Sequence, residues 1–461
     1  MIDVILINPP WIRRKGNIWQ GINSCMPPLG VAYIASYLEK NGISVKILDA
    51  QAEQLPPQEI VRHVLESPAR FIGITATTVL VHTAYEIAAA LKTALPETTI
   101  ILGGVHPTIL PEESLLQPGV DVVIRGEGEQ TLLELVQGKA LETIEGISFR
   151  SDGTIIHNKE RMLIADLDSL PFPAYHLLPI KKYYPAAGAY RRLPAISILT
   201  TRGCPGRCTF CYQIFGRRLR ARSGRNVADE VKLLKERYGI REICFYDDTF
   251  TAIRHNVLDF CRIAIEEKLD ITWSCFARVD FINEEVLYAM KAAGCHQIMF
   301  GFEAASPEIL NAIQKKTNIE KASEAVRMTK KIGIAIRAAF MIGSPQETVQ
   351  TMQDTLAWAI QMNPDIVIFN ITTPYPGTQM FAWAKENGYL LTEDWDEYNL
   401  SKPVMRLPTV TPEEISKFYK IAYRRFYLRP GYIIERLKRL KNLSEWKASW
   451  RAFVSIARIS G

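Results

Sequence analysis

Short apolar runs alternate with amphipathic stretches along the first 140 residues, and this alternation predicts strands with helices between them. The runs are rich in β-branched residues and recur about every 25 residues. They lie at Val4–Ile7, Val45–Leu48, Phe71–Ile74, Ile100–Leu102 and Val122–Ile124. Strands separated by helices are typical of right-handed βαβ units, so we expect an open, parallel α/β sheet over residues 1–140.

The pattern changes between residues 141 and 190, where turn-forming residues interrupt the apolar periodicity. Asp152-Gly153 is a strong turn signal, and Pro171, Pro173 and Pro179 disfavour regular structure in the stretch that follows. We therefore expect a hairpin and then an extended linker over residues 141–190.

A second alternating array follows over residues 191–400. Its expected strands are Ile196–Leu199, Glu242–Tyr246, Ile271–Phe276, Gln297–Gly301, Ile334–Ile342 and Ile366–Ile371. Amphipathic segments such as Ala228–Arg237 and Thr348–Gln361 lie between them. Six strand–helix repeats predict a parallel (β/α)6 barrel, complete or partial. In such a barrel, ligands bind at the carboxyl ends of the strands.

The last part of the chain, residues 401–461, is expected to be helical and basic. Thr411 opens the sequence Thr-Pro-Glu-Glu and is suited to cap a helix. From Thr411 onward there are 12 Lys and Arg against 4 Asp and Glu, whereas the whole chain has a net charge of +6. All of the basic excess therefore lies in this tail, where aromatic residues from Tyr419 to Trp450 are interleaved with the charges.

Three roles suit a basic, aromatic helix: a solvated cap on the barrel, contact with an anionic membrane surface, and nucleic-acid binding. A capping helix is the commonest of these, and membrane contact comes next. No recognition module accompanies the charge in this sequence, so we expect no nucleic-acid partner.

Composition and length indicate an ordinary globular protein of two or three domains, with 461 residues, 48% apolar and 23% charged. The longest uncharged run, Ile366–Ala384, contains Asn370, Pro374 and Pro376, so it predicts a strand and a loop rather than a membrane span. The sequence shows no charged segment followed by an apolar core and a small-residue cleavage site, so we expect that the protein is not secreted. Three of the eight cysteines crowd together and the rest are scattered, which favours a reducing, cytoplasmic location.

The crowded cysteines are Cys204, Cys208 and Cys211, just after the first strand of the second array. Soft thiolate ligands select zinc or an iron–sulfur cluster. A structural zinc site needs a fourth ligand, and no second Cys pair or His-x-x-x-His sequence lies nearby to supply it. Three ligands suit a four-iron cluster with one iron open to a substrate. The cysteines are thus expected to be both the metal ligands and the catalytic centre.

The Cys-x3-Cys-x2-Cys loop resembles the hallmark of the radical S-adenosylmethionine (SAM) superfamily, and the resemblance covers residues 190–400. It implies a 4Fe-4S cluster whose open iron chelates SAM, and one-electron cleavage of SAM to methionine and a deoxyadenosyl radical. An external electron donor such as a flavodoxin or ferredoxin is implied as well. Phe210 matches the residue whose backbone contacts the adenine in this superfamily.

Further matches lie at later strand ends. Asp247 and Asp248 occupy the place of the second-strand motif, near the SAM amino group. Adjacent strand residues point to opposite sides, so at most one of them need face the site. Arg278 and Arg337 are candidates for pairing with the SAM carboxylate, although a surface salt bridge is at least as common a role for an arginine.

The fourth and fifth strands carry two more matches. Gly301 and Glu303 fit the motif that touches the ribose of SAM, and the loop with Gly343 and Pro345 fits the motif that touches the ribose and adenine. The spacing of these residues from the cysteines gives the resemblance its weight.

The first sheet resembles the Rossmann-like cobalamin-binding domain that precedes many radical SAM barrels. Small residues fit where a corrin must lie against backbone, and threonine hydroxyls can donate to its polar groups. The residues that carry this resemblance follow the strand ends. They are Asn8, Pro9, Pro10, Leu29, Gly30, Thr75, Thr77, Gly103, Gly104, His106, Gly126, Glu127 and Glu129.

The resemblance is incomplete in one respect. The Asp-x-His-x-x-Gly sequence that supplies an axial histidine to cobalt in some cobalamin domains is absent, because Asn-Pro-Pro-Trp follows the first strand. We expect cobalamin to bind without an axial histidine from the protein. His106, which precedes Pro107 on a loop, more often orders such a loop than ligates a metal.

These resemblances imply a cobalamin-dependent radical SAM enzyme, of the class B methyltransferase or anaerobic magnesium-protoporphyrin cyclase type. It would methylate an unactivated carbon of a small-molecule substrate. An oxidative cyclase or C–C bond-forming enzyme acting on a hydrophobic tetrapyrrole or lipid is the alternative, and the Arg424–Pro430 sequence resembles such enzymes. The basic tail would then suit peripheral contact with the inner membrane surface. A zinc-stabilised scaffold is a third, non-catalytic alternative.

Overall fold

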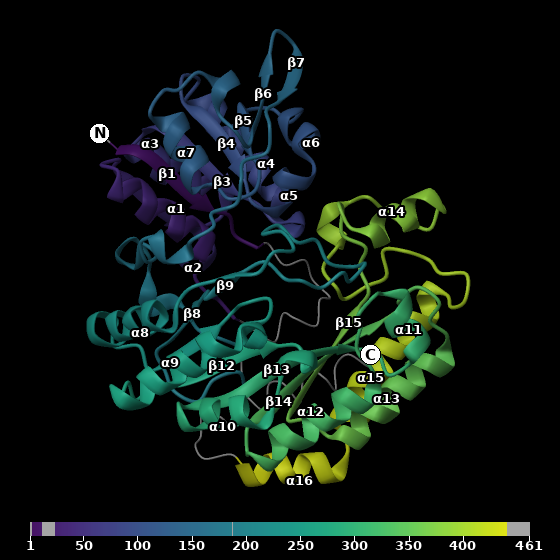
Figure 1. Cartoon of the computed structure of the whole chain (residues 1–461). Helices are drawn as coiled ribbons and strands as arrows, with labels where there is room; N and C mark the ends of the chain where they lie inside the picture. The colour runs from purple at the N-terminus through teal and green to yellow at the C-terminus, as the bar shows by residue number, and fades with distance from the viewer. Residues whose placement is uncertain (1, 12–23, 187, 440–461) are drawn as a thin grey trace.

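The computed structural model describes residues 2–11, 24–186 and 188–439, and it contains two large sheets, one mixed and one parallel (Figure 1). The first sheet has seven strands in the order β2-β1-β3-β4-β5-β6-β7. Its parallel strands are β1 (Ile2–Asn8), β2 (Val45–Asp49), β3 (Ala69–Thr75), β4 (Thr99–Gly103) and β5 (Val122–Ile124). All five strands expected in the first 140 residues are therefore confirmed.

Helices cover both faces of the first sheet because its strands are apolar on both sides. Val4 and Leu6 of β1 join the core beneath α1 and α7, whereas Ile5 and Ile7 join the core beneath α3 and α4. The helices are α1 (Leu29–Lys40), α2 (Ala50–Glu53), α3 (Pro57–Glu66), α4 (Val81–Ala94), α5 (Val105–Ile109), α6 (Pro111–Leu115) and α7 (Glu129–Val136).

The predicted hairpin consists of β6 (Ile147–Ser151) and β7 (Thr154–His157), and it belongs to the first sheet. β6 pairs antiparallel with β5, with Phe149 opposite Val122. Burial explains this pairing, because Ile147 and Phe149 are at most 2% exposed and need an apolar partner surface. The first sheet thus continues to His157, inside the stretch that the sequence assigned to the connection.

The second sheet is an open barrel of six parallel strands in the order β15-β14-β13-β12-β11-β8. These strands are β8 (Ala195–Ile198), β11 (Glu242–Phe245), β12 (Thr272–Ala277), β13 (Cys295–Glu303), β14 (Ala335–Ile342) and β15 (Ile366–Ile371). The outer helices are α8 (Gly224–Tyr238), α9 (Arg254–Glu266), α10 (Glu284–Ala292), α11 (Pro307–Ala312), α12 (Ile319–Lys331) and α13 (Val349–Met362). The expected partial (β/α)6 barrel is confirmed, and it lies below the first sheet in Figure 1.

The C-terminal region contains α14 (Gln379–Glu386), α15 (Pro412–Tyr427) and α16 (Pro430–Arg439). The predicted cap at Thr411 is confirmed: its hydroxyl accepts from the Glu414 N–H, and the Glu414 carboxylate accepts from the Thr411 N–H. None of the described helices has the length and apolarity needed to cross a membrane. Trp446 and Trp450 of the predicted aromatic tail lie outside the described residues.

Tyrosines of the tail occupy the free edge of β15. The Tyr427 hydroxyl accepts from the Val367 N–H at 2.9 Å and donates to the Val367 carbonyl at 2.6 Å. Tyr423 does the same with Phe369, at 3.1 Å and 3.0 Å. Four residues along a helix and two along a strand both span roughly 6 Å, so the two side chains match the strand repeat. The helix thereby satisfies an edge that would otherwise invite another strand.

We expect Tyr427→Phe to lower the free energy of unfolding by about 1–3 kcal/mol, because it leaves a buried N–H and a buried carbonyl of Val367 unpaired. Denaturant unfolding monitored by circular dichroism measures the change. Tyr288→Phe is the matched control, since Tyr288 is 52% exposed. Equal stability of the two variants would contradict this role for the hydroxyl.

Candidate functional site

The three cysteines lie on a loop between two short antiparallel strands, β9 (Thr201–Arg202) and β10 (Arg220–Ala221). Gly203 begins the loop with a φ of +93°, and a Cβ there would lie 2.5 Å from the Arg218 carbonyl oxygen. Only glycine allows this close approach. The Gln213 side chain donates to the Gly206 carbonyl at 2.7 Å and holds the cysteine turn in place.

The sulfur atoms gather on one side of this turn. A Cβ built on Gly206 would lie 3.4 Å from Cys204 Sγ and 3.9 Å from Cys208 Sγ. Burial, the nearby Asp248 carboxylate and the other two thiols raise the pKa of Cys211 to about 12. Cluster binding must therefore displace protons from these thiols.

The three thiols are not gathered around a single point. Tetrahedral zinc with Zn–S bonds of about 2.3 Å places its sulfur ligands roughly 3.8 Å apart. Among the described residues, three candidate ligand atoms come within 4.8 Å of one another only at His82, Asp394 and Asp396. The three-ligand motif itself, and not the spacing of the sulfurs, favours an iron–sulfur cluster over zinc.

Two cations, each paired with a carboxylate, lie beside the cysteine loop. Arg278 Nη1 lies 3.9 Å from Cys208 Sγ, and Arg278 Nη2 donates to Asp280 at 2.6 Å and to the Lys315 carbonyl at 2.9 Å. Lys315 Nζ is buried and donates to Glu303 Oε1 at 2.6 Å. These positive charges stabilise thiolate ligands and a bound cluster. Lys315 has no sequence signal of its own and was missed.

Gly301 leaves room for the Glu303 carboxylate. A Cβ at Gly301 would lie 2.6 Å from Glu303 Oε1, and the pairing of β13 with β14 shifts register at this point. Glu303 itself has a φ of +69°. Bulges and positive φ values of non-glycine residues concentrate where a side chain must be aimed at a ligand. The two residues of the predicted ribose motif are therefore brought together.

The two adjacent aspartates have different surroundings. Asp247 is buried and accepts hydrogen bonds from the backbone and hydroxyl groups of Thr200 and Thr201, and its burial raises its pKa to about 6. Asp248 is exposed and close enough to Cys204 and Cys211 to raise their pKa. Asp247 thus orders the strand before the cysteine loop, and Asp248 faces the cysteines.

The other predicted SAM contacts are distributed around the barrel. Phe210 packs partly buried against the main core, within the cysteine loop. The Gly343 and Ser344 N–H groups donate to the buried Glu347 carboxylate, at 2.6 Å and 2.8 Å, which shapes the loop that contains Pro345. Arg337 lies within β14, away from the cysteines.

The predicted cobalamin residues lie at the carboxyl edge of the first sheet, where ligands of open α/β sheets bind. Thr75, Gly103 and Asn8 end their strands. The Asn8 amide donates to Asp49 at 2.8 Å, next to the buried Pro9 and Pro10. Thr77 is exposed and Leu29 is buried at the start of α1.

Two glycines test whether this edge can hold a flat corrin. A Cβ added at Gly30 or at Gly126 would meet no atom of the described residues within 4 Å, so both face space that these residues leave open. A Cβ at Gly104 would instead lie 2.8 Å from the Ala76 carbonyl, so this glycine serves the tight β4–α5 turn. Open backbone beside the partly exposed Thr75 fits close approach of a cobalamin.

Glu127 and Glu129 form buried ion pairs with arginines of the second domain. Arg202 donates to Glu127 Oε1 at 2.8 Å and to Glu129 Oε1 at 2.6 Å, and Arg220 donates to both oxygens of Glu127 at 2.9 Å and 3.0 Å. All four side chains are at most 6% exposed. Their carboxylates therefore bind the strands that bracket the cysteine loop. Arg202, two residues before Cys204, was missed in the sequence.

His106 is fully buried and its Nε2 lies 3.3 Å from Glu113 Oε1. Trp395 also donates to this oxygen, at 2.9 Å. Trp395 belongs to the 3-10 helix η9 (Trp395–Glu397), which follows the barrel in sequence but packs into the core of the first domain. His106 thus orders an interface between the domains.

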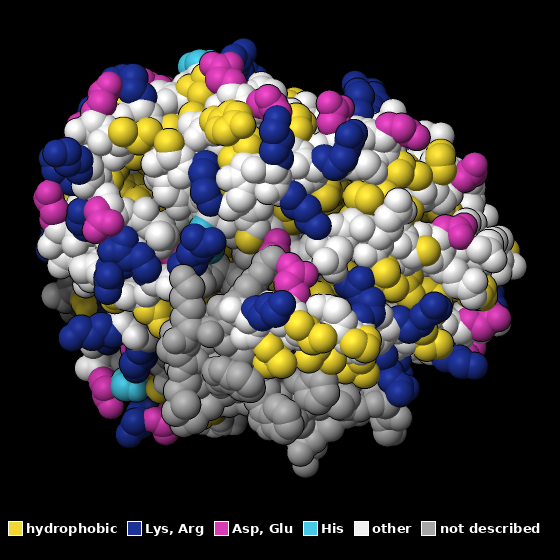
Figure 2. All heavy atoms as spheres, turned by 90° about the horizontal axis from the view of Figure 1, so that it is seen from below, with side chains coloured by type: hydrophobic (Ala, Val, Ile, Leu, Met, Phe, Trp, Pro, Cys, Tyr) yellow, Lys and Arg dark blue, Asp and Glu magenta, His cyan; other side chains and the backbone are white. Residues whose placement is uncertain are grey.

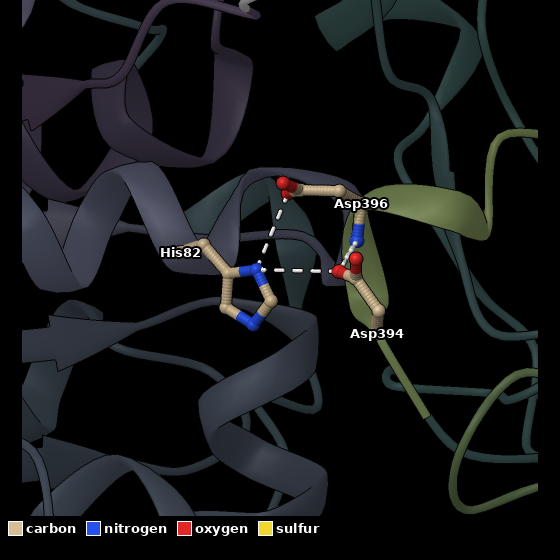
Figure 3. Close-up of side chains that lie close together, drawn as sticks. All are labelled: His82, Asp394 and Asp396. Carbon is tan, nitrogen blue, oxygen red and sulfur yellow. Dashed lines mark hydrogen bonds and ion pairs between the residues drawn. The ribbon is translucent and has the colours of Figure 1, made fainter. Parts of the chain in front are cut away.

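A second contact joins η9 to the first domain (Figure 3). His82 Nδ1 of α4 lies 3.6 Å from Asp394 Oδ1 and 3.4 Å from Asp396 Oδ1. The Asp394 side chain also accepts from the Asp396 N–H as the cap of η9. Capping and ion pairing account for this cluster without a metal.

We expect Glu127→Gln to lower the free energy of unfolding by about 3–5 kcal/mol, because it leaves Arg202 and Arg220 short of buried negative charge. Anaerobic denaturant unfolding measures this loss. Glu160→Gln, at an exposed position in the same region, is the control. If both variants unfold at the same denaturant concentration, the buried ion pairs do not hold the domains together.

Comparisons with known proteins agree with this geometry. The B12 binding domain family matches residues 20–136, and the Radical SAM superfamily matches residues 198–359. A protein of Pyrococcus horikoshii named an uncharacterized methyltransferase is 38% identical over 442 residues, which cover 94% of each chain. The anaerobic magnesium-protoporphyrin IX monomethyl ester cyclase of Rubrivivax gelatinosus is 29% identical, over 88% of this chain and 75% of that one.

The fold has a counterpart among solved structures. The radical S-adenosylmethionine methyltransferase TsrM from Kitasatospora setae, with cobalamin and a [4Fe-4S] cluster bound, superposes with a TM-score of 0.71 and 18% identity. The match covers 94% of this chain and 90% of that one. The two domains and their order are thus shared with this structure. The two family matches and the 38% identical relative show that the chain belongs to the cobalamin-dependent radical SAM enzymes.

Proposed function

We propose that this enzyme methylates an unactivated carbon of a small-molecule substrate. The observation that carries the proposal is the buried contact of Glu127 and Glu129 with Arg202 and Arg220, which ties the ligand edge of the first sheet to the cysteine loop. When bound, the cluster and SAM supply a radical that removes a hydrogen atom, and cobalamin supplies the methyl group. The full-length likeness to a methyltransferase supports this outcome.

The residues around the loop would bind and orient the cofactors. Cys204, Cys208 and Cys211 ligate three irons, and Arg278 donates toward Cys208 Sγ. Asp248, in the loop after β11 and near the cysteines, would offer a carboxylate to the SAM ammonium group. Gly301 would leave room for the ribose of SAM and Glu303 would bind it. Phe210 and the Gly343–Pro345 loop would contact the adenine.

The edge of the first sheet would hold cobalamin without a histidine ligand. Gly30, Gly103 and Gly126 allow the corrin to lie against backbone, and Thr75 and Thr77 donate to its polar groups. The His106 imidazole supports this view, because it is fully buried and its Nε2 faces Glu113. The domain above the barrel then excludes water from the reacting carbon.

An oxidative cyclisation is the second candidate, and the 29% identity to the Rubrivivax cyclase favours it. The tail sequence Arg424–Pro430 does not distinguish methylation from cyclisation. Arg429 donates to the Phe426 and Ile360 carbonyls and to Asn363, at 2.8 Å, 3.1 Å and 2.9 Å. These contacts pack the tail on the barrel and serve either reaction.

We further propose an external flavodoxin or ferredoxin as electron donor, and a peripheral membrane contact through the tail. A groove of about 520 Å³ is lined by Ile421, Arg424, Arg425, Leu428, Arg429 and Pro430. Arg424 and Arg425 are exposed, and Ile434 and Leu437 of α16 are also exposed at 54% and 43%. Figure 2 shows Lys and Arg side chains with hydrophobic side chains between them on the face viewed from below. Such a surface suits anionic headgroups.

We expect anaerobic turnover of the reconstituted enzyme with a productive substrate to yield deoxyadenosine and S-adenosylhomocysteine together, with a product heavier by one methylene. Mass spectrometry of incubations with lipids and tetrapyrroles measures all three. Cys208→Ala should abolish them, whereas Cys244→Ala, at a buried strand position outside the loop, should not. Deoxyadenosine without S-adenosylhomocysteine would exclude methyl transfer and favour cyclisation.

We expect the protein to sediment with vesicles that contain phosphatidylglycerol, and Arg424→Glu/Arg425→Glu to reduce this binding several-fold, because each basic residue near the surface contributes about 1 kcal/mol. Salt should weaken the binding by screening. Arg262→Glu on α9 is the control for net charge. Equal binding to neutral phosphatidylcholine vesicles, or to neither, would contradict the membrane contact.

A further inference from the structure

The interior of the barrel carries one row of side chains that contains a single cation. Tyr246 and Phe276 stand beside each other with ring centroids 5.2 Å apart. Strand register places Phe276 next to Met299, Met299 next to Arg337, and Arg337 next to Ile366. The row thus crosses five neighbouring strands, and Arg337 is its one charged member.

The row faces a space that solvent reaches. Along β14, Ile336 and Ala338 are 0% exposed and belong to the main core, whereas Arg337 between them is partly exposed. Tyr246 is 39% exposed, although the preceding Phe245 is 0% exposed and packs among core aromatic rings. Every member of the row is at least partly exposed, so the row lines an accessible interior.

The Arg337 guanidinium has no anionic partner in the part of the chain that the structure describes. Its Nε is buried and makes no hydrogen bond. The titratable groups that act on it most strongly are Tyr246, Tyr427, Cys244 and Tyr423, all of them neutral at physiological pH. Desolvation by these surroundings lowers the Arg337 pKa.

Other buried arginines of this protein are paired. Arg202 and Arg220 contact glutamates of the first domain, and Arg222 pairs with Glu230. A buried cation without a counterion is unfavourable by several kcal/mol. Where the scaffold has a fully buried arginine, it therefore supplies a carboxylate. Arg337, which is partly exposed but has a buried Nε, has no carboxylate partner among the described residues.

Arg337 is also separate from the cysteine loop. Arg278 approaches Cys208 Sγ and is stabilised by Asp280, whereas the strongest influences on Arg337 come from Tyr246, Tyr427, Cys244 and Tyr423, none of which belongs to the cysteine loop. Register places Arg337 two residues below Ala339, the neighbour of Gly301, which is about 7 Å deeper in the barrel. The position suits a molecule that enters below the SAM contacts.

We propose that Arg337 binds an oxyanion of the substrate, a carboxylate or a phosphate-type group, while Tyr246, Phe276 and Met299 contact its apolar part. The inference rests on the proposed function, because it takes the barrel interior as the substrate site. A guanidinium binds either oxyanion through two parallel hydrogen bonds. The substrate is therefore an amphiphile with one anionic end.

Phenylphosphonate is a suitable probe, since it joins one aromatic ring to one oxyanion. We expect it to bind the reconstituted, SAM-loaded holoenzyme saturably in anaerobic ³¹P NMR titrations. Arg337→Gln should weaken this binding about tenfold or more, the loss expected for a hydrogen bond to a charged group. The neutral diethyl ester of the probe should bind more weakly than the anion, and Arg262→Gln on the surface should bind like wild type.

Three results would overturn the proposal: unchanged probe binding in Arg337→Gln, equal binding of the neutral diester, or an equal loss of SAM affinity in Arg337→Gln, which would assign the guanidinium to SAM. If Arg337→Gln fails to take up iron, Arg337→Lys, which keeps the charge, and the comparison of anion with diester in wild type decide. Failure of methylation is read from S-adenosylhomocysteine, so it remains distinguishable from failure of this site.

Discussion

Four charged side chains buried between the domains determine how the two cofactor sites face each other. Arg202 and Arg220 lie on the two strands that bracket the cysteine loop, and Glu127 and Glu129 follow the last parallel strand of the first sheet. Each charge has lost its water, so any shift between the domains would leave a buried ion without its partner. The Arg202 guanidinium is also 5.2 Å from the centre of the Tyr33 ring on α1. The contact therefore orients the ligand edge of the first sheet over the barrel.

A second attachment makes this arrangement rigid. Trp395, Tyr398 and Val404 come after the barrel in sequence but are buried in the apolar core beneath β1 and β3 of the first domain. The Trp395 indole N–H and the His106 ring share the Glu113 carboxylate. The ion pairs of Arg202 and Arg220 thus start just after β8, the first strand of the barrel, and the Trp395 contact starts after β15, its last strand. A relative rotation of the domains would break both attachments.

Local patterns in the sequence predicted the strands. They did not predict contacts between residues that lie far apart in the chain. The two arrays and the Cys204–Cys211 loop were predicted because apolar periodicity and ligand spacing are local properties. The association of β6 with β5 depends on which edge is free. Glu127 was predicted to contact a cofactor because it follows a strand end. Its partner, Arg202, lies 75 residues away, so no local pattern shows the ion pair. Lys315 gave no signal, since a lone lysine shows neither period nor spacing.

The arginines of this protein differ in how many of their hydrogen-bond and ion-pair positions are occupied. Arg222 is fully occupied by Glu230, Tyr33 and the Leu199 carbonyl, and it can bind nothing else. Arg278 is half occupied by Asp280 and turns its other nitrogen to Cys208. Arg337 has no carboxylate at all among the described residues. A partly desolvated, unpaired charge lowers stability, and a ligand that completes the pair would account for it in an otherwise well-paired protein. Among the described residues, Arg222 near the domain interface is thus fully paired, Arg278 beside the cysteine loop is partly paired, and Arg337 in the barrel interior is unpaired.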